Sequence, residues 1–255
     1  MPFPRFYYPG QIDVGQVIEL PTNAMHHAVR VLRLEQGNKV TLFNGEGGEF
    51  PAFIERISKT GVLVLTEKYL DVERESPFQI TLAQGICASV KMDWIVRKTV
   101  ELGVGDIQPI AAKRSLVKLS DERADKRVRH WQQIVISACE QCGRNRLPQV
   151  LPPMFLPDWL DRQIGVKKNL SNEISQNLFF MLSPIAEKGL RDFSKFSSVT
   201  NLTLLVGPEG GFTSEENAIV LVAGFIPLRL GRRTLRTESA AFAAIAALQV
   251  LWGDF

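Results

Sequence analysis

The stretch Leu204–Glu216, which reads Leu-Leu-Val-Gly-Pro-Glu-Gly-Gly-Phe-Thr-Ser-Glu-Glu, has the most specific pattern in the chain. Its apolar start is typical of a buried strand that ends at Gly207, and the Gly-Gly pair that follows lets the backbone approach a ligand closely. Thr213 and Glu216 have the spacing of a capping box, which predicts the start of a helix. Backbone N–H groups at a helix start are free to bind a polar ligand. The stretch therefore predicts a binding loop, with a simple tight turn as the alternative.

Two well-known phosphate-binding loops do not fit this stretch. A Walker A loop needs a Gly-Lys pair followed by Ser or Thr, and the chain contains no Gly-Lys pair. A Rossmann fingerprint opens a long series of strands and helices, whereas fewer than 50 residues follow Gly211. The ligand of the loop is therefore expected to belong to another class.

A second candidate segment is Leu228–Ala241, which reads Leu-Arg-Leu-Gly-Arg-Arg-Thr-Leu-Arg-Thr-Glu-Ser-Ala-Ala. Gly231 follows a predicted strand, and an Ala-rich helix is predicted to open at Thr237. Arg236 and Glu238 lie where the loop after Gly231 would meet this helix. Parallel sheets bind ligands at the carboxyl ends of their strands, so these residues are candidates for function. A capped helix with surface arginines is the alternative.

The elements that must position these segments begin at Phe78, where predicted strands start to alternate with longer helices. This alternation is typical of a parallel α/β sheet. Strands are predicted at residues 79–86, 107–111, 178–182, 202–206 and 227–230. The last three strands run directly into loops, so the candidate segments are expected to share one edge of the sheet.

Two helices are predicted between these strands. In the helix at 91–102, apolar residues recur on one face, and Asp93, Arg97 and Glu101 form an i,i+4 charged ladder on the other. Ser120 can cap a second helix, whose apolar stripe ends at the next glycine.

The first 70 residues predict a small β-rich unit with one helix. Thr22 can cap that helix, which ends before Gly37. Strands are predicted at 39–43, 50–57 and 62–66, with a glycine-rich turn at Asn44–Gly48. Short strands joined by glycine turns indicate a compact barrel. Because the charged segment Asp71–Pro77 is suited to a linker, the predicted domains are 1–72 and 73–255.

Length and composition exclude several classes. The 255 residues are 45% hydrophobic and 22% charged, which suits two modest globular domains rather than a disordered or fibrous chain. No apolar run reaches the roughly 20 residues of a membrane span, and the N-terminus lacks the apolar core of a signal peptide. Three cysteines do not make a disulfide framework. We expect a cytoplasmic protein with no membrane partner.

Charge is distributed unevenly along the chain. Residues 1–72 carry 7 basic and 8 acidic residues, whereas residues 73–255 carry 23 and 19. Within Lys113–Arg146, 9 basic residues accompany 4 acidic ones. Such a cluster indicates contact with a phosphate backbone, although a solvated basic helix has the same composition.

Cysteine and histidine offer weaker candidates. Cys139 and Cys142 have redox or zinc spacing, but they lie in a predicted helix and only Cys87 remains elsewhere, so we expect no metal. His130 is expected to be solvated. His27, like the residue before it, suits either a helix surface or an RNA contact.

Together the two candidate segments resemble the signatures of the RsmE family, SPOUT-class enzymes that methylate N3 of one uridine in 16S (small-subunit) ribosomal RNA. Val206–Phe212 and Leu228–Ala241 carry the resemblance most specifically. Matching pieces elsewhere extend it over nearly the whole chain in the right order: Arg5-Phe-Tyr, His26–Arg33, Lys91–Trp94, Lys98–Gly103 and Ala138–Arg144. One departure is Cys142, where many relatives have a small hydroxyl residue.

The resemblance implies an α/β protein with an N-terminal PUA-like β-barrel followed by a SPOUT methyltransferase domain whose chain forms a trefoil knot. It also implies a homodimer and S-adenosylmethionine as the cofactor. The residues expected to bind this cofactor are Leu182, Ser183, Gly207, Pro208, Glu209, Gly210, Gly211, Leu230, Gly231, Leu235, Arg236 and Thr237. The expected partner is 16S rRNA, within the small ribosomal subunit or a late precursor. The residues expected to contact it are Arg5, His26, Arg30, Arg33, Lys91, Arg114, Gln141 and Arg144.

The implied reaction needs the proton on uracil N3 to leave. Arg236 is the candidate for stabilising the charge that develops on the base. Glu238 or Glu209 can take the proton, or either can hold Arg236 by a bidentate pair. Two alternatives remain: a SPOUT enzyme that methylates the ribose 2′-OH of rRNA or tRNA, and an RNA-binding protein without catalysis.

Overall fold

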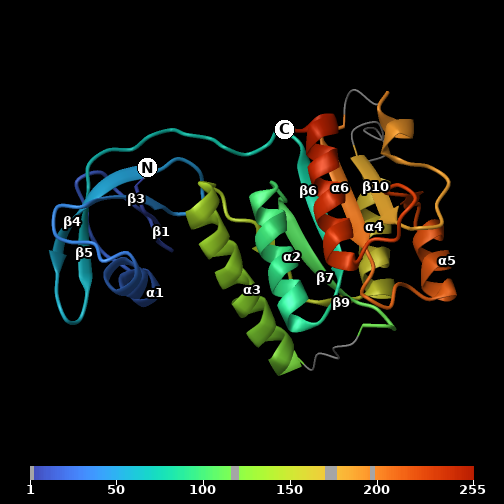
Figure 1. The fold of residues 1–255 in the computed structure, drawn as a ribbon, viewed down its shortest axis with the longest axis horizontal. Coiled ribbons are helices and arrows are strands. Elements are labelled where there is room, and N and C mark those ends of the chain that lie inside the picture. The colour runs from blue at the N-terminus through green and yellow to red at the C-terminus, as the bar shows by residue number, and fades with distance from the viewer. Residues whose placement is uncertain (1–2, 116–120, 170–176, 196–198) are drawn as a thin grey trace. The chain divides into compact units, whose positions relative to one another are not determined.

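The computed structural model describes residues 3–115, 121–169, 177–195 and 199–255 (Figure 1). The chain forms two compact units. The first comprises Met1–Glu75 and Ile136–Leu147, and the second comprises Ser76–Val135 and Pro148–Phe255. The first unit thus includes a segment that lies far along the chain from the rest of it.

The first unit is built on a five-stranded sheet with the order β1-β3-β4-β5-β2. Its strands are β1 (Arg5–Tyr7), β2 (Val17–Glu19), β3 (Lys39–Phe43), β4 (Phe50–Ile57) and β5 (Val62–Thr66). β1 pairs with β3 in parallel, and the other neighbours are antiparallel. The structure confirms the three predicted strands. β1 and β2 were not predicted, because three residues are too few to show an alternating pattern.

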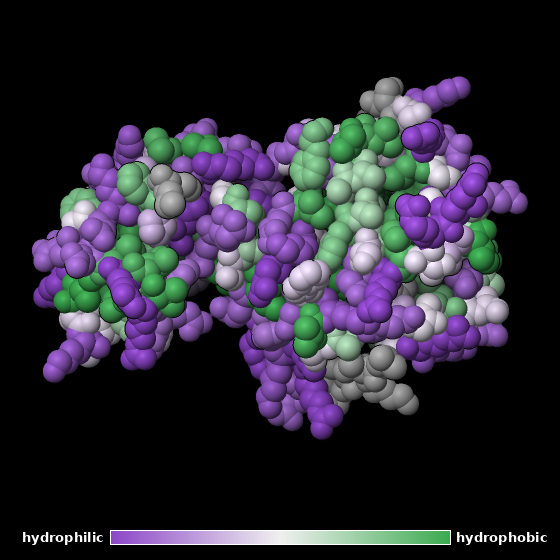
Figure 2. Space-filling view, viewed as in Figure 1, coloured by the Kyte–Doolittle hydropathy of each residue, from purple (hydrophilic) through white to green (hydrophobic). Residues whose placement is uncertain are grey.

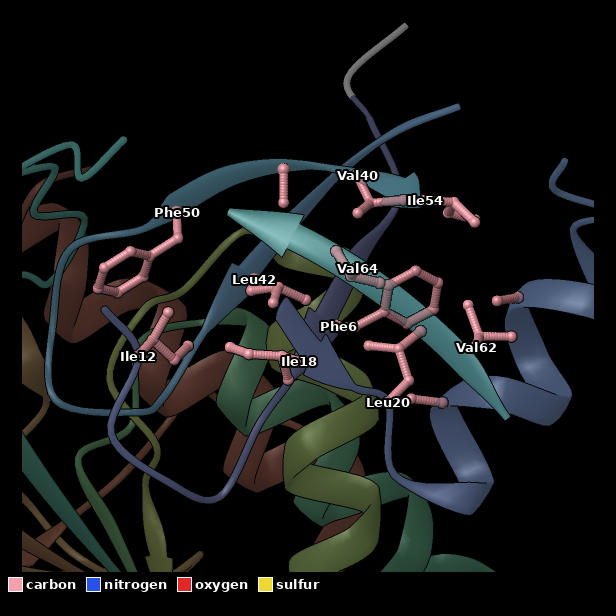
Figure 3. Close-up of a cluster of buried hydrophobic side chains, with 13 residues drawn as sticks. Phe6, Ile12, Ile18, Leu20, Val40, Leu42, Phe50, Ile54, Val62 and Val64 are labelled. Atoms are coloured by element: carbon pink, nitrogen blue, oxygen red, sulfur yellow. The ribbon is translucent and has the colours of Figure 1, made fainter. Parts of the chain in front are cut away.

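A single apolar core holds this sheet together (Figure 3). Alternate residues of each strand point to the same face, so Leu42, Ile54 and Val64 all face inward and are fully buried. Phe6 from β1 is also fully buried against them. The curled sheet therefore encloses its core, as the barrel prediction requires.

The helix of the first unit differs from the prediction at its start. α1 (Thr22–His26) has Pro21 as its N-cap, with no side-chain cap, so the prediction that Thr22 caps it is wrong. Thr22 is instead the first helical residue, which places its hydroxyl inside the first turn. The helix continues as one π-helical segment (His27–Val31) and ends before Gly37, as predicted.

The second unit is built on a seven-stranded sheet with the order β12-β10-β11-β6-β7-β8, and β9 also pairs with β7. Every pairing in it is parallel. The strands are β6 (Gln79–Gly85), β7 (Asp106–Ala111), β8 (Gln149–Val150), β9 (Met154–Phe155), β10 (Asn177–Leu182), β11 (Asn201–Val206) and β12 (Ile226–Leu228). The structure confirms the predicted parallel α/β class and all five predicted strands, while the two-residue β8 and β9 were not predicted.

Helices cover both faces of this sheet. α2 (Ser89–Glu101) and α6 (Thr237–Trp252) lie side by side on one face (Figure 1). The rings of Phe180, from β10, and Trp252, from α6, are stacked. α4 (Leu156–Asn169) and α5 (Ser214–Val222) pack against the neighbouring residues that point the other way, such as Met181 and Leu205. The remaining helices are α3 (Asp121–Cys142) and a short 3-10 helix, Leu190–Phe193.

The charged ladder predicted on α2 is wrong. Glu101 pairs with Lys98 at 2.8 Å, and Asp93 contacts His130 on α3 at 3.0 Å. The neighbouring helix supplies Asp93 with a partner that spacing within one helix does not reveal. The predicted cap Ser120 lies outside the described residues. No helix in the described part of the chain is long and apolar enough to cross a membrane.

Candidate active site

Parallel strands place the candidate loops together. β6, β10, β11 and β12 are neighbours in the sheet and end at the same edge. The loops after β10, β11 and β12 surround a cavity of about 440 Å³. Every residue expected to bind the cofactor lines it: Leu182, Ser183, Gly207, Pro208, Glu209, Gly210, Gly211, Leu230, Gly231, Leu235, Arg236 and Thr237.

Glycine is required at several positions near the cavity, because another part of the chain lies where a side chain would be. A Cβ atom on Gly85, the last residue of β6, would lie 2.4 Å from the backbone nitrogen of Pro208. A Cβ atom on Gly210 would lie 3.0 Å from Cβ of Arg114. Gly211 has a φ of +64°, which side chains disfavour. The loop after β11 is therefore shaped by its glycines, as the sequence predicted.

The capping box at the start of α5 is confirmed. Thr213 Oγ1 accepts a hydrogen bond from the Glu216 backbone N–H at 3.2 Å, and Glu216 Oε2 accepts one from the Thr213 N–H at 2.9 Å. Glu216 Oε1 accepts a further bond from the Lys113 N–H at 2.7 Å, and the residue is 3% exposed. The cap thus also ties α5 to the loop after β7.

Two residues expected to contact RNA lie at the cavity instead of on a remote surface. Lys91 lines it and pairs with Glu209 at 3.3 Å, while Arg114 donates to the Gly210 carbonyl at 3.2 Å. Burial opposes ionisation of Glu209, but hydrogen bonds from its own backbone N–H and that of Ala88, together with Lys91, outweigh it and lower its pKa. Glu209 is therefore ionised at neutral pH and anchors the loop.

Arg236 and Glu238 differ in environment. Arg236 lines the cavity, is exposed, and precedes the first turn of α6. Glu238 is half-buried in that first turn and is not a lining residue, and its Oε2 atom is buried without a hydrogen-bond partner. Within the described residues, neither Glu238 nor Glu209 forms an ion pair with Arg236, whereas Glu209 pairs with Lys91. The bidentate pair considered from the sequence is absent there.

Arg5 and Arg144 are held in ion pairs inside the first unit. Arg5 pairs with Glu49 at 2.5 Å and also donates to the side chain of Asn145. Arg144 Nε donates to Glu75 at 2.9 Å, and the arginine is 6% exposed. These contacts give both arginines a structural role, and RNA contact by them remains a prediction.

The other residues expected to contact RNA are exposed in the first unit. His26, Arg30 and Arg33 come from α1 and the segment that follows it, and Gln141 comes from the last turn of α3. Arg33 has a φ of +52°, where the chain leaves the helix. This group is separate from the two cavity residues in the other unit.

Cysteine chemistry gives no second site. Burial raises the pKa of the Cys139 thiol to about 12, and Cys142 is half-buried. The described residues contain no group of histidine, cysteine or acidic side chains that could hold a metal ion.

Several lining residues were missed from the sequence. Asn217, Phe212, Arg233 and Thr234 also border the cavity. Asn217 lies one helical turn after Thr213, so its position beside the capping residue could have revealed it. Arg233 and Thr234 lie within the predicted loop, but no sequence pattern distinguished them from their neighbours.

The fold and this site match an RNA methyltransferase with an added PUA domain. A family model described as an RNA methyltransferase domain matches residues 74–249, and one described as an RNA methyltransferase PUA domain matches residues 20–67. "Ribosomal RNA small subunit methyltransferase E" of Buchnera aphidicola (from Schizaphis graminum) is 34% identical, over 98% of this chain and 97% of that protein. The protein of the same name from Bacillus subtilis is 29% identical, over 96% and 95%.

Solved structures agree with these matches. The small subunit methyltransferase E of Neisseria gonorrhoeae bound to S-adenosylmethionine has a TM-score of 0.87 and 40% identity, over 99% of both chains. A Legionella pneumophila structure described as a possible methyltransferase with this cofactor bound has a TM-score of 0.90 and 40% identity, over 100% of both. This chain therefore belongs to the ribosomal RNA small subunit methyltransferase E family, as the resemblance predicted.

The cavity fits S-adenosylmethionine, the cofactor of this family. Its volume lies in the range of roughly 300–1,000 Å³ typical of small-molecule sites. Apolar residues such as Leu182 and Leu235 and glycines of the loop after β11 line it together, which suits an adenosine with polar edges. Gly231, with a φ of +82° and open space where a Cβ would lie, leaves room for a ligand. The residues of the pocket are thus compatible with the cofactor.

Proposed function

We propose that this protein methylates N3 of one uridine in small-subunit (16S) ribosomal RNA, with S-adenosylmethionine as the methyl donor. The observation that carries the proposal is one cavity, formed by three strand-end loops, with the unpaired Arg236 on its wall. When bound, the cofactor supplies an electrophilic methyl group. The cofactor-binding residues are those that line the cavity in the loops after β10, β11 and β12.

The substrate base must lose its N3 proton and carry negative charge over the two flanking carbonyl oxygens. Arg236 stabilises this charge, because it lines the cavity and its guanidinium has no partner among the described residues. Its donors are at the cavity wall before reaction, close to where this charge develops. Arg236 is therefore the principal catalytic residue.

Glu238 accepts the N3 proton in this proposal. It lies two residues after Arg236, and like Glu209 it has a buried Oε2 atom without a hydrogen-bond donor. Glu209 is less suited, since its contacts lower its pKa and commit it to Lys91 and the loop. Glu209 thus positions the binding loop, and Glu238 takes the proton.

RNA is bound by both functional domains, 1–72 and 73–255. The exposed residues His26, Arg30 and Arg33 hold the phosphate backbone, as contacts that position rather than select. Lys91 and Arg114, at the cavity, hold the RNA next to the reacting base. Because N3 lies on the Watson–Crick edge, the uridine must be unpaired or flipped out.

We also infer that the protein works as a homodimer. Figure 2 shows an apolar band over α6. Val250 on α6 and Val90 and Trp94 on α2 are 69%, 78% and 53% exposed, although the two helices are packed neighbours. Exposed apolar side chains on a pair of packed helices are suited to a protein interface. We also propose the trefoil knot that the family implies. The three loops that meet at the cavity are the segments that would form it.

The test uses purified protein, labelled S-adenosylmethionine and small ribosomal subunits from cells that lack the enzyme. After digestion to nucleosides, label is expected in 3-methyluridine. Label in a 2′-O-methylated nucleoside would replace the proposal by the ribose alternative. No transfer to subunits, naked rRNA or tRNA, with cofactor bound normally, would favour an RNA-binding protein without catalysis.

A further inference from the structure

A buried polar cluster lies beneath the cavity, at the junction of β6, the loop after β11 and the start of α6. It consists of Gln84, Thr237 and the backbone carbonyl of Gly207. Gln84 is fully buried and Thr237 is 8% exposed. Gln84 Oε1 has no hydrogen-bond partner among the described residues, whereas the Gln84 amide nitrogen and the Thr237 hydroxyl are both paired. Buried polar groups are normally paired, so these two contacts show what the cluster holds.

The hydrogen bonds of this cluster have a defined direction. Thr237 Oγ1 lies 2.6 Å from the Gly207 carbonyl oxygen, which can only accept, so the hydroxyl donates to it. The hydroxyl has one hydrogen, and it must therefore accept from Gln84 Nε2 at 3.0 Å. The second N–H of Gln84 has the Gly85 carbonyl at 3.0 Å. The three elements are thus joined in one chain of bonds.

The cluster contacts the loop after β11 next to Pro208, where this loop packs closely against β6. Gly85 approaches Pro208 so closely that a Cβ would lie 2.4 Å from its backbone nitrogen. Pro208 then closes a turn by accepting from the Gly211 N–H at 2.9 Å. Fixing the Gly207 carbonyl therefore fixes the direction in which this whole turn enters the cavity.

We propose that Gln84 and Thr237 are positioning residues, which hold the Gly207 carbonyl and so keep the loop after β11 in its cofactor-binding shape. The Thr237 hydroxyl serves the loop rather than the ligand, because its hydrogen and an acceptor site are used within the protein. The inference rests on the cofactor pocket of the proposed function, but not on the identity of the RNA substrate.

Thr237→Val removes the hydroxyl at nearly constant volume. The Gly207 carbonyl then loses its donor at 2.6 Å and keeps only Gln84 Nε2 at 3.5 Å. We expect the affinity for S-adenosylmethionine, measured by calorimetry, to fall about tenfold or more. Thr237→Ser keeps the hydroxyl and is expected to recover most of that affinity. Thr99→Val is the matched control, since Thr99 is also fully buried and donates to the Ile95 carbonyl at 2.8 Å, far along α2 from the cavity.

Gln84→Met tests the second member of the cluster. It preserves length but removes the amide donor, so it should weaken cofactor binding in the same way. In the double variant with Thr237→Val, the two effects should combine to much less than their product, because both act on one carbonyl. Full multiplication of the effects would contradict a shared role.

Cys87 provides a readout without cofactor. Its thiol is 1% exposed, donates to the Gly85 carbonyl, and lies 3.9 Å from Thr237 Oγ1. Alkylation of the cofactor-free protein, followed by peptide mass spectrometry, should label Cys87 slowly in the parent and Thr99→Val proteins. Labelling should be about tenfold faster in Thr237→Val, where the junction opens more often.

Two results would overturn the inference: parent-like cofactor affinity and Cys87 labelling in Thr237→Val, or equal losses in Thr237→Ser and Thr237→Val. The second result would mean that the hydroxyl alone does not hold the loop, because Thr237→Ser retains it. If the parent protein bound no S-adenosylmethionine, the proposed function would fail, while Cys87 labelling would still test the cluster.

Discussion

Two regions rich in arginine contrast within this molecule. In the first unit, Arg144 is buried and Arg5 is half-buried, and they pair with the carboxylates of Glu75 and Glu49, respectively. At the cavity of the second unit, Arg236 is exposed and has no ion pair within the described residues. Both regions contain arginines, but those of the first unit are in ion pairs and Arg236 is not.

The difference separates arginines that hold the fold from those available to a substrate. A buried pair satisfies both charges inside the protein and has little left to offer RNA. An unpaired guanidinium at a cavity retains its donors for charge that develops during reaction. The same distinction sets Arg30 and Arg33, which are exposed, apart from Arg5 in the first unit.

The largest effect is expected at the buried pair. Arg144→Ala leaves Glu75 without its partner and should lower the free energy of unfolding by about 3–5 kcal/mol. Arg146→Ala is the matched control, because its pair with Glu73 is half exposed and should contribute about 1 kcal/mol or less. Urea unfolding of both variants checks this, and equal losses would remove the contrast.

The next effect is expected at the cavity. Arg236→Ala should slow methyl transfer by about 100-fold or more, because a donor to developing charge is lost. Its unfolding midpoint should remain close to that of the parent protein. Single-turnover assays with saturating cofactor measure the step, and parent-like turnover would show that Arg236 is not the stabilising group.

A smaller effect is expected at the exposed arginines Arg30 and Arg33, which we propose to bind RNA. Reversing Arg30 and Arg33 to Glu should weaken RNA binding and flatten its salt dependence by about 0.7 in the slope of log K for each lost contact. Reversing Lys59 and Lys68, two exposed lysines of the same unit, makes the same change in net charge and is the control. Filter binding over a salt series measures both slopes. Identical behaviour of the two pairs would mean that only net charge matters.

The smallest effect concerns pH. Burial opposes ionisation of Glu49, but Arg74 and Arg5 outweigh it and lower its pKa below the ordinary 4.5. Because the folded protein holds the ionised form more tightly, the pairs stabilise it above about pH 4.5, and this stability is lost as pH falls through the lowered pKa. Glu49→Gln should lose stability at neutral pH and show a weaker further loss below pH 4.5. An unchanged acid profile would contradict the pairing.

Much of the fold could be predicted from the sequence, since long apolar runs and glycine turns act locally. The strands 39–43 and 202–206 and the capping box at Thr213 have patterns that depend only on neighbouring residues. Short strands such as Arg5–Tyr7 have no such pattern, because their pairing with distant segments decides their conformation.

In the candidate site, too, local features could be predicted from the sequence and long-range contacts could not. The loop residues could be predicted because glycine and proline spacing constrains the backbone directly. The partners of charged side chains could not, since Arg144 and Glu75 are 69 residues apart and meet only in the folded chain. Lys91 was expected to contact RNA, but its pairing with Glu209 depends on how the loop after β11 folds back. Gln84 had a weak signal, as a polar residue beside glycine at the end of an apolar strand.

The central claim is that the cavity of the second unit methylates a base in small-subunit RNA. The most direct test is mass spectrometry of ribosomal RNA from cells that lack the protein, complemented with the parent gene or with Arg236→Ala. We expect loss of one base-methylated uridine from the small-subunit RNA, restored by the parent gene and not by the variant. Small-subunit RNA with unchanged base methylation, or a lost methyl group that maps to ribose or to another RNA, would contradict the account.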